Sequence, residues 1–178
     1  MVQQSVNANL DRDESLRASS DRWLALTVPA VVRDSPFYLA AQKMAMVYSS
    51  VATFENAARK FIQDRLLEEL GENWWQQGVP SKTRAAAEKK KKDEENHRYH
   101  GSRGGSLIYY TMLSDLSLII EQNFDLFSHY IPSIEWSRQI FKSIERSRNI
   151  IMHSGDLSMD DVQRVAMNIR DWFQQIGG

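Results

Sequence analysis

The sequence contains no cysteine, and its 178 residues include only four prolines and eight glycines. Without a thiol, the chain has no thiolate nucleophile, no cysteine zinc site and no disulfide. It also lacks an excess of charge of one sign, because 22 Lys and Arg nearly balance 23 Asp and Glu. That balance argues against a protein that coats nucleic acid through bulk charge, so a nucleic-acid contact would have to be local.

Long hydrophobic runs are missing as well. The polar first 22 residues do not have the pattern of a secretory signal. The apolar stretch 23–32 is interrupted by Pro29 and falls short of the ~20 residues that span a bilayer. With 42% apolar and 25% charged residues, the composition is that of one soluble globular domain. We therefore expect a cytoplasmic protein with no membrane partner.

Helical periodicity dominates what is present. Residues 1–35 predict an N-terminal arm, with a short helix opening near Asp11, that packs on the body or on a dimer partner. After Pro36, one apolar stripe predicts a long helix to about Leu70, where Gly71 supplies the stop. The stripe steps alternately by four and three through Ala40, Met44, Val47, Val51, Phe54, Ala58 and Phe61. Residues 36–178 form the predicted helical domain.

A charged segment interrupts this domain at about residues 81–105. Residues 81–97 favour a helix but offer hardly any apolar face, and glycines follow them, so we expect a solvated helix in a flexible hairpin or insertion outside the core. Its lysines are candidate RNA contacts, although a solvated helix face is the commoner role for such a run: Lys89, Lys90, Lys91 and Lys92. His97 and His100 have a spacing seen between ligands in metal sites. We nevertheless expect no metal site here, because the segment is flexible and the chain has no cysteine.

Three further helices are predicted in the second half. Ser114, Ser133 and Ser158 are their expected N-caps. The first should end before Pro132 and the second near Gly155. The last should face inward through Val162, Val165, Ile169 and either Trp172 or Phe173. Since no strand alternation is found, the predicted fold class is all-α, an antiparallel bundle of four to five helices.

The candidate for chemistry is Arg148-Asn149-x-x-x-His153, at the end of the penultimate helix. A guanidinium fits phosphate oxygens, and histidine can move a proton near neutral pH. The same residues also have a purely structural interpretation. Histidine is favoured in a last helical turn, and Arg148 can pair with Glu145 or with a carboxylate from another helix.

With its flanks, this element resembles the Swt-type branch of the HEPN superfamily. The similar segments are 48–62, 115–123 and 145–155, and the resemblance covers roughly residues 44–174. It implies a metal-independent, cofactor-free endoribonuclease that acts as a homodimer, with two motifs meeting at the interface. Arg148 would contact the scissile phosphate, and His153 would be the acid or base for attack by the 2′-hydroxyl. Asn149 would orient His153 or the phosphate.

Two carboxylates are supporting candidates. Glu121 could position Arg148 across the bundle or be an arginine partner with no catalytic role. Glu55 and Arg59 are expected to form an exposed helical pair worth about 0.3 kcal/mol. Two other functions stay open. One is a non-catalytic HEPN-like module that binds RNA, a nucleotide or a protein, and the other is an interaction bundle whose residues 1–35 swap onto a neighbour. A toxin or phage-defence role, with a separately encoded inhibitor or effector, is a compatible setting.

Overall fold

The long helix α3, Pro36–Leu70, begins and ends where the sequence predicts. The structure is a computed structural model, and it describes residues 35–97, 99 and 101–177 together with residues 18, 19, 22, 26 and 32. Most of the predicted N-terminal arm therefore lies outside the described residues. The chain divides into two compact units, residues 1–43 and residues 44–178. The second unit contains every site discussed below.

Helix α3 ends for a local reason. Gly71 has a φ of +63°, a left-handed conformation that glycine adopts without the steric cost of a Cβ. A 3-10 turn, Gly71–Asn73, and a short helix α4, Trp74–Gly78, follow. Trp75 is buried and Trp74 packs against the core.

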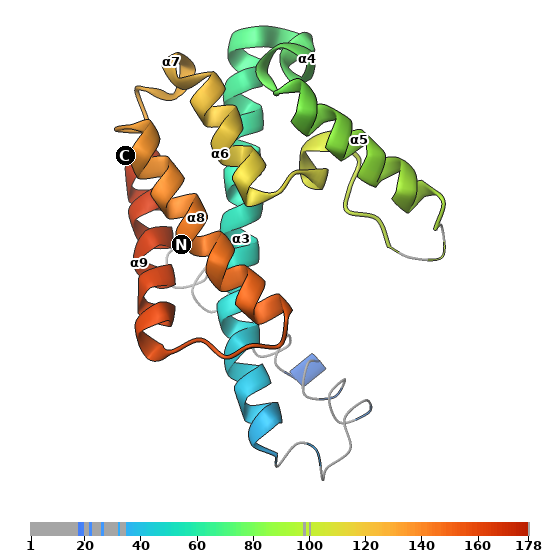
Figure 1. Ribbon diagram of the computed structural model, residues 1–178, viewed down its shortest axis with the longest axis vertical. Coiled ribbons are helices and arrows are strands. Elements are labelled where there is room, and N and C mark those ends of the chain that lie inside the picture. The colour runs from blue at the N-terminus through green and yellow to red at the C-terminus, as the bar shows by residue number, and fades with distance from the viewer. Residues whose placement is uncertain are drawn as a thin grey trace, which may run out of the picture. The chain divides into compact units, whose positions relative to one another are not determined.

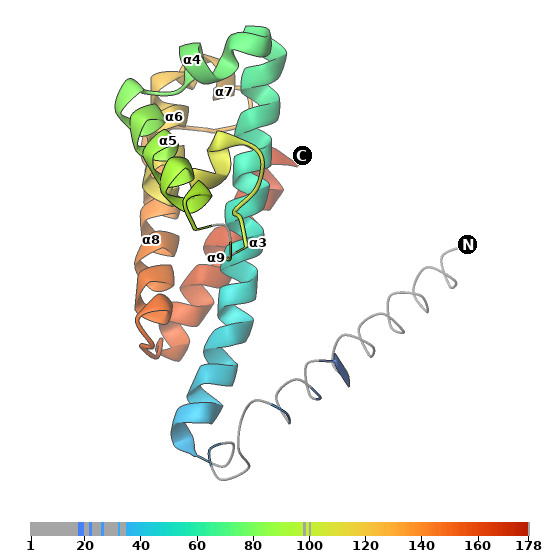
Figure 2. The same ribbon diagram turned by 90° about the vertical axis from the view of Figure 1, so that its right-hand side faces the viewer.

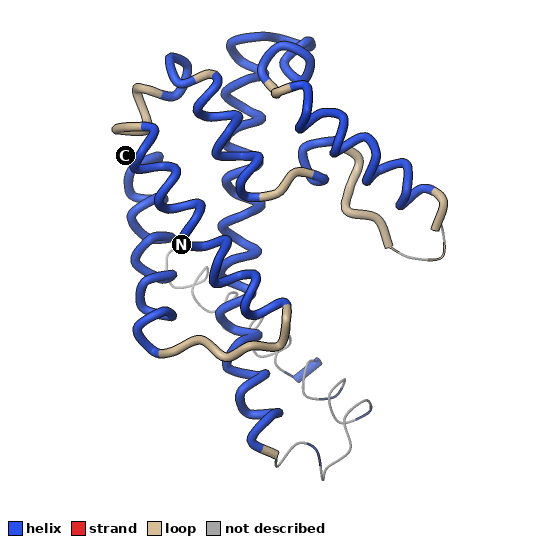
Figure 3. The backbone as a smooth tube through the Cα atoms, viewed as in Figure 1, coloured by secondary structure: helices blue, strands red, loops and turns tan. Residues whose placement is uncertain are grey.

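The second half supplies the other helices of the bundle (Figures 1 and 2). They are α6 at Leu113–Gln122, α7 at Phe124–Phe127, α8 at Ile134–Met152 and α9 at Met159–Ile176. In the part of the chain that the structure describes, Figure 3 shows helices and loops but no strand. The all-α fold class is confirmed, and α8 and α9 run antiparallel across the short connection between them.

An aromatic cluster joins α3 to α8 and α9. The ring centroids of Phe54 and Phe141 are 5.5 Å apart, and each ring also meets the fully buried Trp172, at 5.7 Å and 5.0 Å. Tilted and edge-to-face pairs at such distances are the favoured arrangements of aromatic rings. Trp172, and not the partly exposed Phe173, is thus the inward aromatic of the last helix.

Two of the three predicted caps are confirmed. Ser133 Oγ accepts from Trp136 N at 3.1 Å, and Ser158 Oγ accepts from Asp161 N at 3.2 Å. Ser114 is not a cap, because α6 already starts at Leu113 and the Asp115 carboxylate accepts from Met112 N at 2.8 Å. An acid at the third helical position can serve the N-cap amide in this way.

The first predicted helix of the second half is also shorter than expected. It ends at Gln122, and the chain breaks at Asn123 before α7 begins. The Asn123 side-chain amide donates to the carbonyls of Ile119 and Gly78, both at 2.7 Å. A side chain that binds the preceding turn competes with continued helix, which explains the break.

The charged segment forms helix α5, Ser81–Glu95, close to the bounds of the predicted helix. The prediction that this segment lies outside the core was wrong, because its Thr83 and Ala87 are buried in the bundle. Thr83 Oγ1 donates to Asp115 Oδ1 at 3.3 Å. A 3-10 helix η2, Leu107–Tyr110, packs against α5 and buries Ile108 and Tyr110. Two small side chains and an apolar neighbour suffice to seat a helix that carries almost no hydrophobic stripe.

Gly155 closes the turn between α8 and α9. A Cβ there would lie 2.6 Å from Ile150 Cγ2 and 2.9 Å from the Ile150 carbonyl oxygen, which accepts from Gly155 N. Gly155→Ala should therefore lower the free energy of unfolding by about 1–3 kcal/mol, because the backbone must shift. Gly101→Ala is the matched control, since its Cβ would meet nothing within 4 Å. Urea unfolding measures both, and equal stabilities would contradict the close approach.

Candidate functional site

The end of α8 fixes the backbone of the candidate motif. His153 is the C-cap residue, Ser154 follows in the left-handed conformation with a φ of 60°, and Gly155 N donates to Ile150 O at 2.8 Å. Together with the bond from Ser154 N to Ile151 O at 3.0 Å, this is the geometry of a Schellman turn. The backbone is thus well defined, while the side chains of Asn149 and His153 lie exposed at the helix end.

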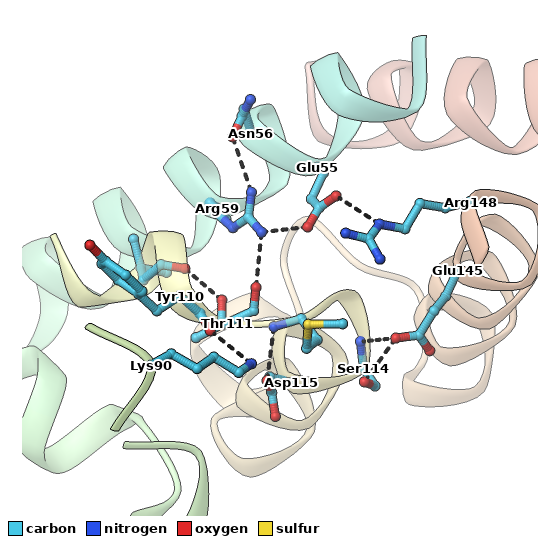
Figure 4. A network of polar contacts seen from close by, with 12 residues as sticks. Glu55, Asn56, Arg59, Lys90, Tyr110, Thr111, Ser114, Asp115, Glu145 and Arg148 are labelled. Carbon is cyan, nitrogen blue, oxygen red and sulfur yellow. Dashed lines mark hydrogen bonds and ion pairs between the residues drawn. The ribbon is translucent and has the colours of Figure 1, made fainter. Parts of the chain in front are cut away.

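Arg148 points back toward α3 (Figure 4). Its Nε lies 3.8 Å from Glu55 Oε2, and its side chain is 25% exposed. Its Nη1 lies 3.5 Å from Asn149 Oδ1, a long contact to the neighbouring motif residue. A carboxylate from another helix was one of the two partners predicted for Arg148, and that alternative is confirmed. The other alternative, Glu145, instead accepts from the Ser114 hydroxyl at 3.0 Å.

Glu55 lies between two arginines. One carboxylate oxygen faces Arg148, and the other accepts a hydrogen bond from Arg59 on the next turn of α3. Arg59 also donates to Asn56 Oδ1 at 3.1 Å and to the carbonyl of Thr111 at 2.9 Å. The side chains of Arg59 and Glu55 are only 10% and 12% exposed. The prediction of an exposed helical pair was wrong, because the segment before α6 covers this face of α3.

Glu121 does not reach Arg148. It forms an ion pair with Arg138 Nη2 at 2.8 Å, with both side chains well exposed to solvent. The hydrogen bond to Glu121 is the main cause that raises the pKa of the Arg138 guanidinium. The prediction that Glu121 positions Arg148 was therefore wrong, and the alternative, that Glu121 is the partner of another arginine, agrees with the structure. Both carboxylates are on helices that face α8, and only the tertiary packing decides which one Arg148 meets.

A cavity of about 470 Å³ opens beside Arg148. Its walls come from α3, α5, α8 and the η2 region, and its polar lining includes Glu55, Arg59, Lys90, Arg103 and Arg148. Lys90 Nζ donates to the Tyr110 carbonyl at 3.1 Å, which places this lysine against η2. The His153 side chain is not part of the lining.

Tyr110 is a buried residue of η2, where this element contacts α5. Burial, and then its hydrogen bond to Glu94, raises the pKa of the Tyr110 hydroxyl, so this group stays neutral at physiological pH. The Arg103 guanidinium carbon lies 5.7 Å from the centroid of the Tyr110 ring, within cation–π range. Glu94 Oε1 also accepts from Arg103 N at 2.8 Å, so one acid holds the loop that carries Arg103.

The four consecutive lysines of α5, residues 89–92, separate into two groups. Lys90 lines the cavity, whereas Lys89 and Lys92 are exposed and Lys91 is half-buried outside its lining. The histidines that follow show no metal-like arrangement where they are described: His97 Nδ1 lies 2.8 Å from the Asp93 carbonyl, and His100 lies outside the described residues. In the described ranges, no group of three or more His, Asp or Glu side chains is placed to hold a metal ion.

Several residues of this site were not singled out by the sequence analysis. Asn56, Thr111 and Tyr109 carry no motif that marks them in advance, and they meet only through the fold. The nearest signal was the sequence Phe54-Glu55-Asn56, which places two polar residues directly after a core position of the long helix. Polar groups that border a buried stripe are candidates for interhelical pairs.

The fold and the site together define the class of this protein: it is an all-helical domain that presents an arginine and a histidine at the end of its penultimate helix. The particular family follows from comparison: the chain belongs to the Swt1-like HEPN family, whose model matches residues 50–177. The predicted family is thereby confirmed. Neither the curated proteins nor the solved structures gave a match. Within the described residues, no helix combines the length and the apolar character needed to span a bilayer.

Removal of the Glu55 carboxylate should strongly destabilise the bundle. Glu55→Ala leaves Arg59 buried without its anionic partner and releases Arg148, so the free energy of unfolding should fall by about 3 kcal/mol. Asp64→Ala is the matched control on the same helix, because Asp64 pairs with Lys60 at 2.7 Å and the two side chains are 54% and 75% exposed. Such exposed pairs contribute little to stability, because water screens their attraction. Urea unfolding measures both variants. Similar losses of unfolding free energy would contradict the expectation that burial of the Glu55–Arg59 pair makes its disruption costly.

Proposed function

We propose that this protein is a metal-independent endoribonuclease whose active site is formed across a homodimer. The observation that carries the proposal is the orientation of Arg148, which the buried Glu55 carboxylate holds at the edge of a cation-lined cavity. A guanidinium held in this way has little conformational freedom left to lose when it binds a phosphate. Membership of the HEPN family and the exposed His153 one turn further along support the same assignment.

The proposed chemistry needs three groups of the motif. His153 acts as the base that takes the proton of a ribose 2′-hydroxyl, or as the acid that protonates the leaving 5′-oxygen. The 2′-oxygen attacks phosphorus, the bond to the 5′-oxygen breaks, and the products are a 2′,3′-cyclic phosphate and a free 5′-hydroxyl. Arg148 stabilises the negative charge that develops on the phosphoryl oxygens. Asn149 orients His153 or a phosphate oxygen.

The helix geometry supports a site that two protomers share. Arg148 and His153 are five residues apart, so on one helix they are separated by roughly 140° of rotation and about 7.5 Å of rise. The arginine faces α3, whereas the histidine faces solvent. Ile150 and Met152, between them in the sequence, are 44% and 52% exposed. An apolar, exposed helix end is a suitable surface for a second copy, which would bring its own motif to the site.

Cleavage of RNA in the presence of EDTA tests the chemistry. Wild type should cut single-stranded RNA, while Arg148→Ala and His153→Ala should each lose at least about 100-fold in rate, the usual effect of losing such a group. Size-exclusion chromatography must show that both variants keep the oligomeric state of the wild type. Undiminished activity in either variant would refute the assignment. A wild type that binds RNA without cutting it would favour a binding module.

Mixed dimers test the shared site. If one site takes Arg148 from one protomer and His153 from the other, a dimer of the two inactive variants keeps one intact site. Random 1:1 exchange of a symmetric dimer should then restore about a quarter of wild-type activity. If both residues act within one protomer, the same mixture stays inactive. Each inactive variant, denatured and refolded alone, is the control.

A further inference from the structure

The cavity beside Arg148 has a size and a composition that the cleavage step does not require. Its volume of about 470 Å³ falls in the range of roughly 300–1,000 Å³ that is typical of small-ligand sites. Arg148 lines one side of it, and the rest of the wall belongs to residues with no role in proton transfer. All of these residues lie in the second unit of the chain.

The lining is strongly cationic. Arg59, Lys90, Arg103 and Arg148 contribute four positive charges, and Glu55 is the one carboxylate among the described lining residues. Glu55 is already engaged by Arg59 and Arg148. Lys90 uses one donor on the Tyr110 carbonyl, which leaves two N–H groups for a ligand, and the Arg103 side chain is exposed. An anionic ligand would relieve this excess of positive charge.

Two tyrosines add aromatic faces to the same cavity. Tyr48 on α3 and Tyr109 in η2 both line it, and each is 39% exposed. The chain passes close to the Tyr109 ring at Gly104, where φ is +135° and a Cβ would lie 3.1 Å from Tyr109 Cδ2. That glycine lets the loop bearing Arg103 lie against the ring. Cations for a phosphate and ring faces for a base are together the requirements of a nucleotide.

We propose that this cavity binds one nucleotide of the RNA, adjacent to the phosphate held by Arg148. Lys90 and Arg103 contact its phosphate, and its base stacks on Tyr109. The inference rests on the proposed function in one respect, that the phosphate at Arg148 is the scissile one. It also separates Lys90 from the other three lysines of the run as the residue that contacts RNA inside the cavity.

An RNA decamer that is 2′-O-methylated throughout is the probe, because it has no 2′-hydroxyl nucleophile and its binding is independent of cleavage. Lys90→Ala and Tyr109→Ala in the full chain should each raise its Kd about tenfold or more, the range expected for a lost stacking or phosphate contact. Tyr109→Phe keeps the ring and should bind as wild type does. Lys89→Ala, which removes an exposed lysine of α5 outside the cavity lining, is the charge-matched control.

The outcomes separate this inference from the proposed function. Unchanged affinity in both alanine variants overturns the nucleotide site even if wild type cleaves RNA. Weaker binding in both, with wild-type affinity in the two controls, supports the site even if no RNA is cut. AMP is the second probe: if it binds wild type as tightly as the decamer does and with the same dependence on Lys90 and Tyr109, a free nucleotide is the ligand and the RNA assignment is overturned.

Discussion

The site depends on the ion pairs that the Glu55 carboxylate forms with Arg59 and Arg148. A carboxylate that is nearly excluded from solvent is costly unless cations and hydrogen-bond donors surround it. Here Arg59 lies on one side of the carboxylate and Arg148 on the other. Arg59 also donates a hydrogen bond to the carbonyl of Thr111, just before α6. One anion thus connects α3, α8 and the start of α6. The orientation of Arg148 is therefore a property of the whole bundle and not of its own helix.

The two halves of the motif have contrasting surroundings. Arg148 is three-quarters buried and faces Glu55. His153 is the exposed C-cap residue of α8, at the Schellman turn that ends the helix. Preorganised charge is most effective where the group cannot move, and a proton-transfer group must reach its substrate. The division fits the proposal that catalysis needs a second copy, because the exposed end is the part of the motif that one protomer leaves incomplete.

Helix α5 changes the interpretation of the charged segment. Its buried Thr83 and Ala87 hold it against the bundle, and the wide charged face that remains is directed in part into the cavity through Lys90. Glu94 is hydrogen-bonded to Arg103 N and to Tyr110, and Lys90 to the Tyr110 carbonyl. These bonds hold α5 against η2 and the loop before it. A segment with almost no hydrophobic stripe can belong to a core when its neighbours supply the apolar surface.

Much of the fold could be predicted from sequence because its signals are local. The stripe on α3, the Ser133 and Ser158 caps and the stop at Gly71 each depend on residues within one or two turns. The break at Asn123 and the start of α6 were missed, because hydrogen bonds to Gly78 and from Met112 to Asp115 compete with the simplest helical pattern.

The sequence by itself determined the helical class, the family and the residues of the Arg148–His153 element, since these are written in periodicity and in a short contiguous motif. It did not determine the partner of Arg148. Glu145 lies on α8 itself, three residues before Arg148, whereas Glu55 and Glu121 lie on neighbouring helices, and the sequence does not show which of the three Arg148 meets. Only the packing of α3 against α8 decided for Glu55, because an ion pair depends on distance and burial in space, which residue spacing along the chain does not encode.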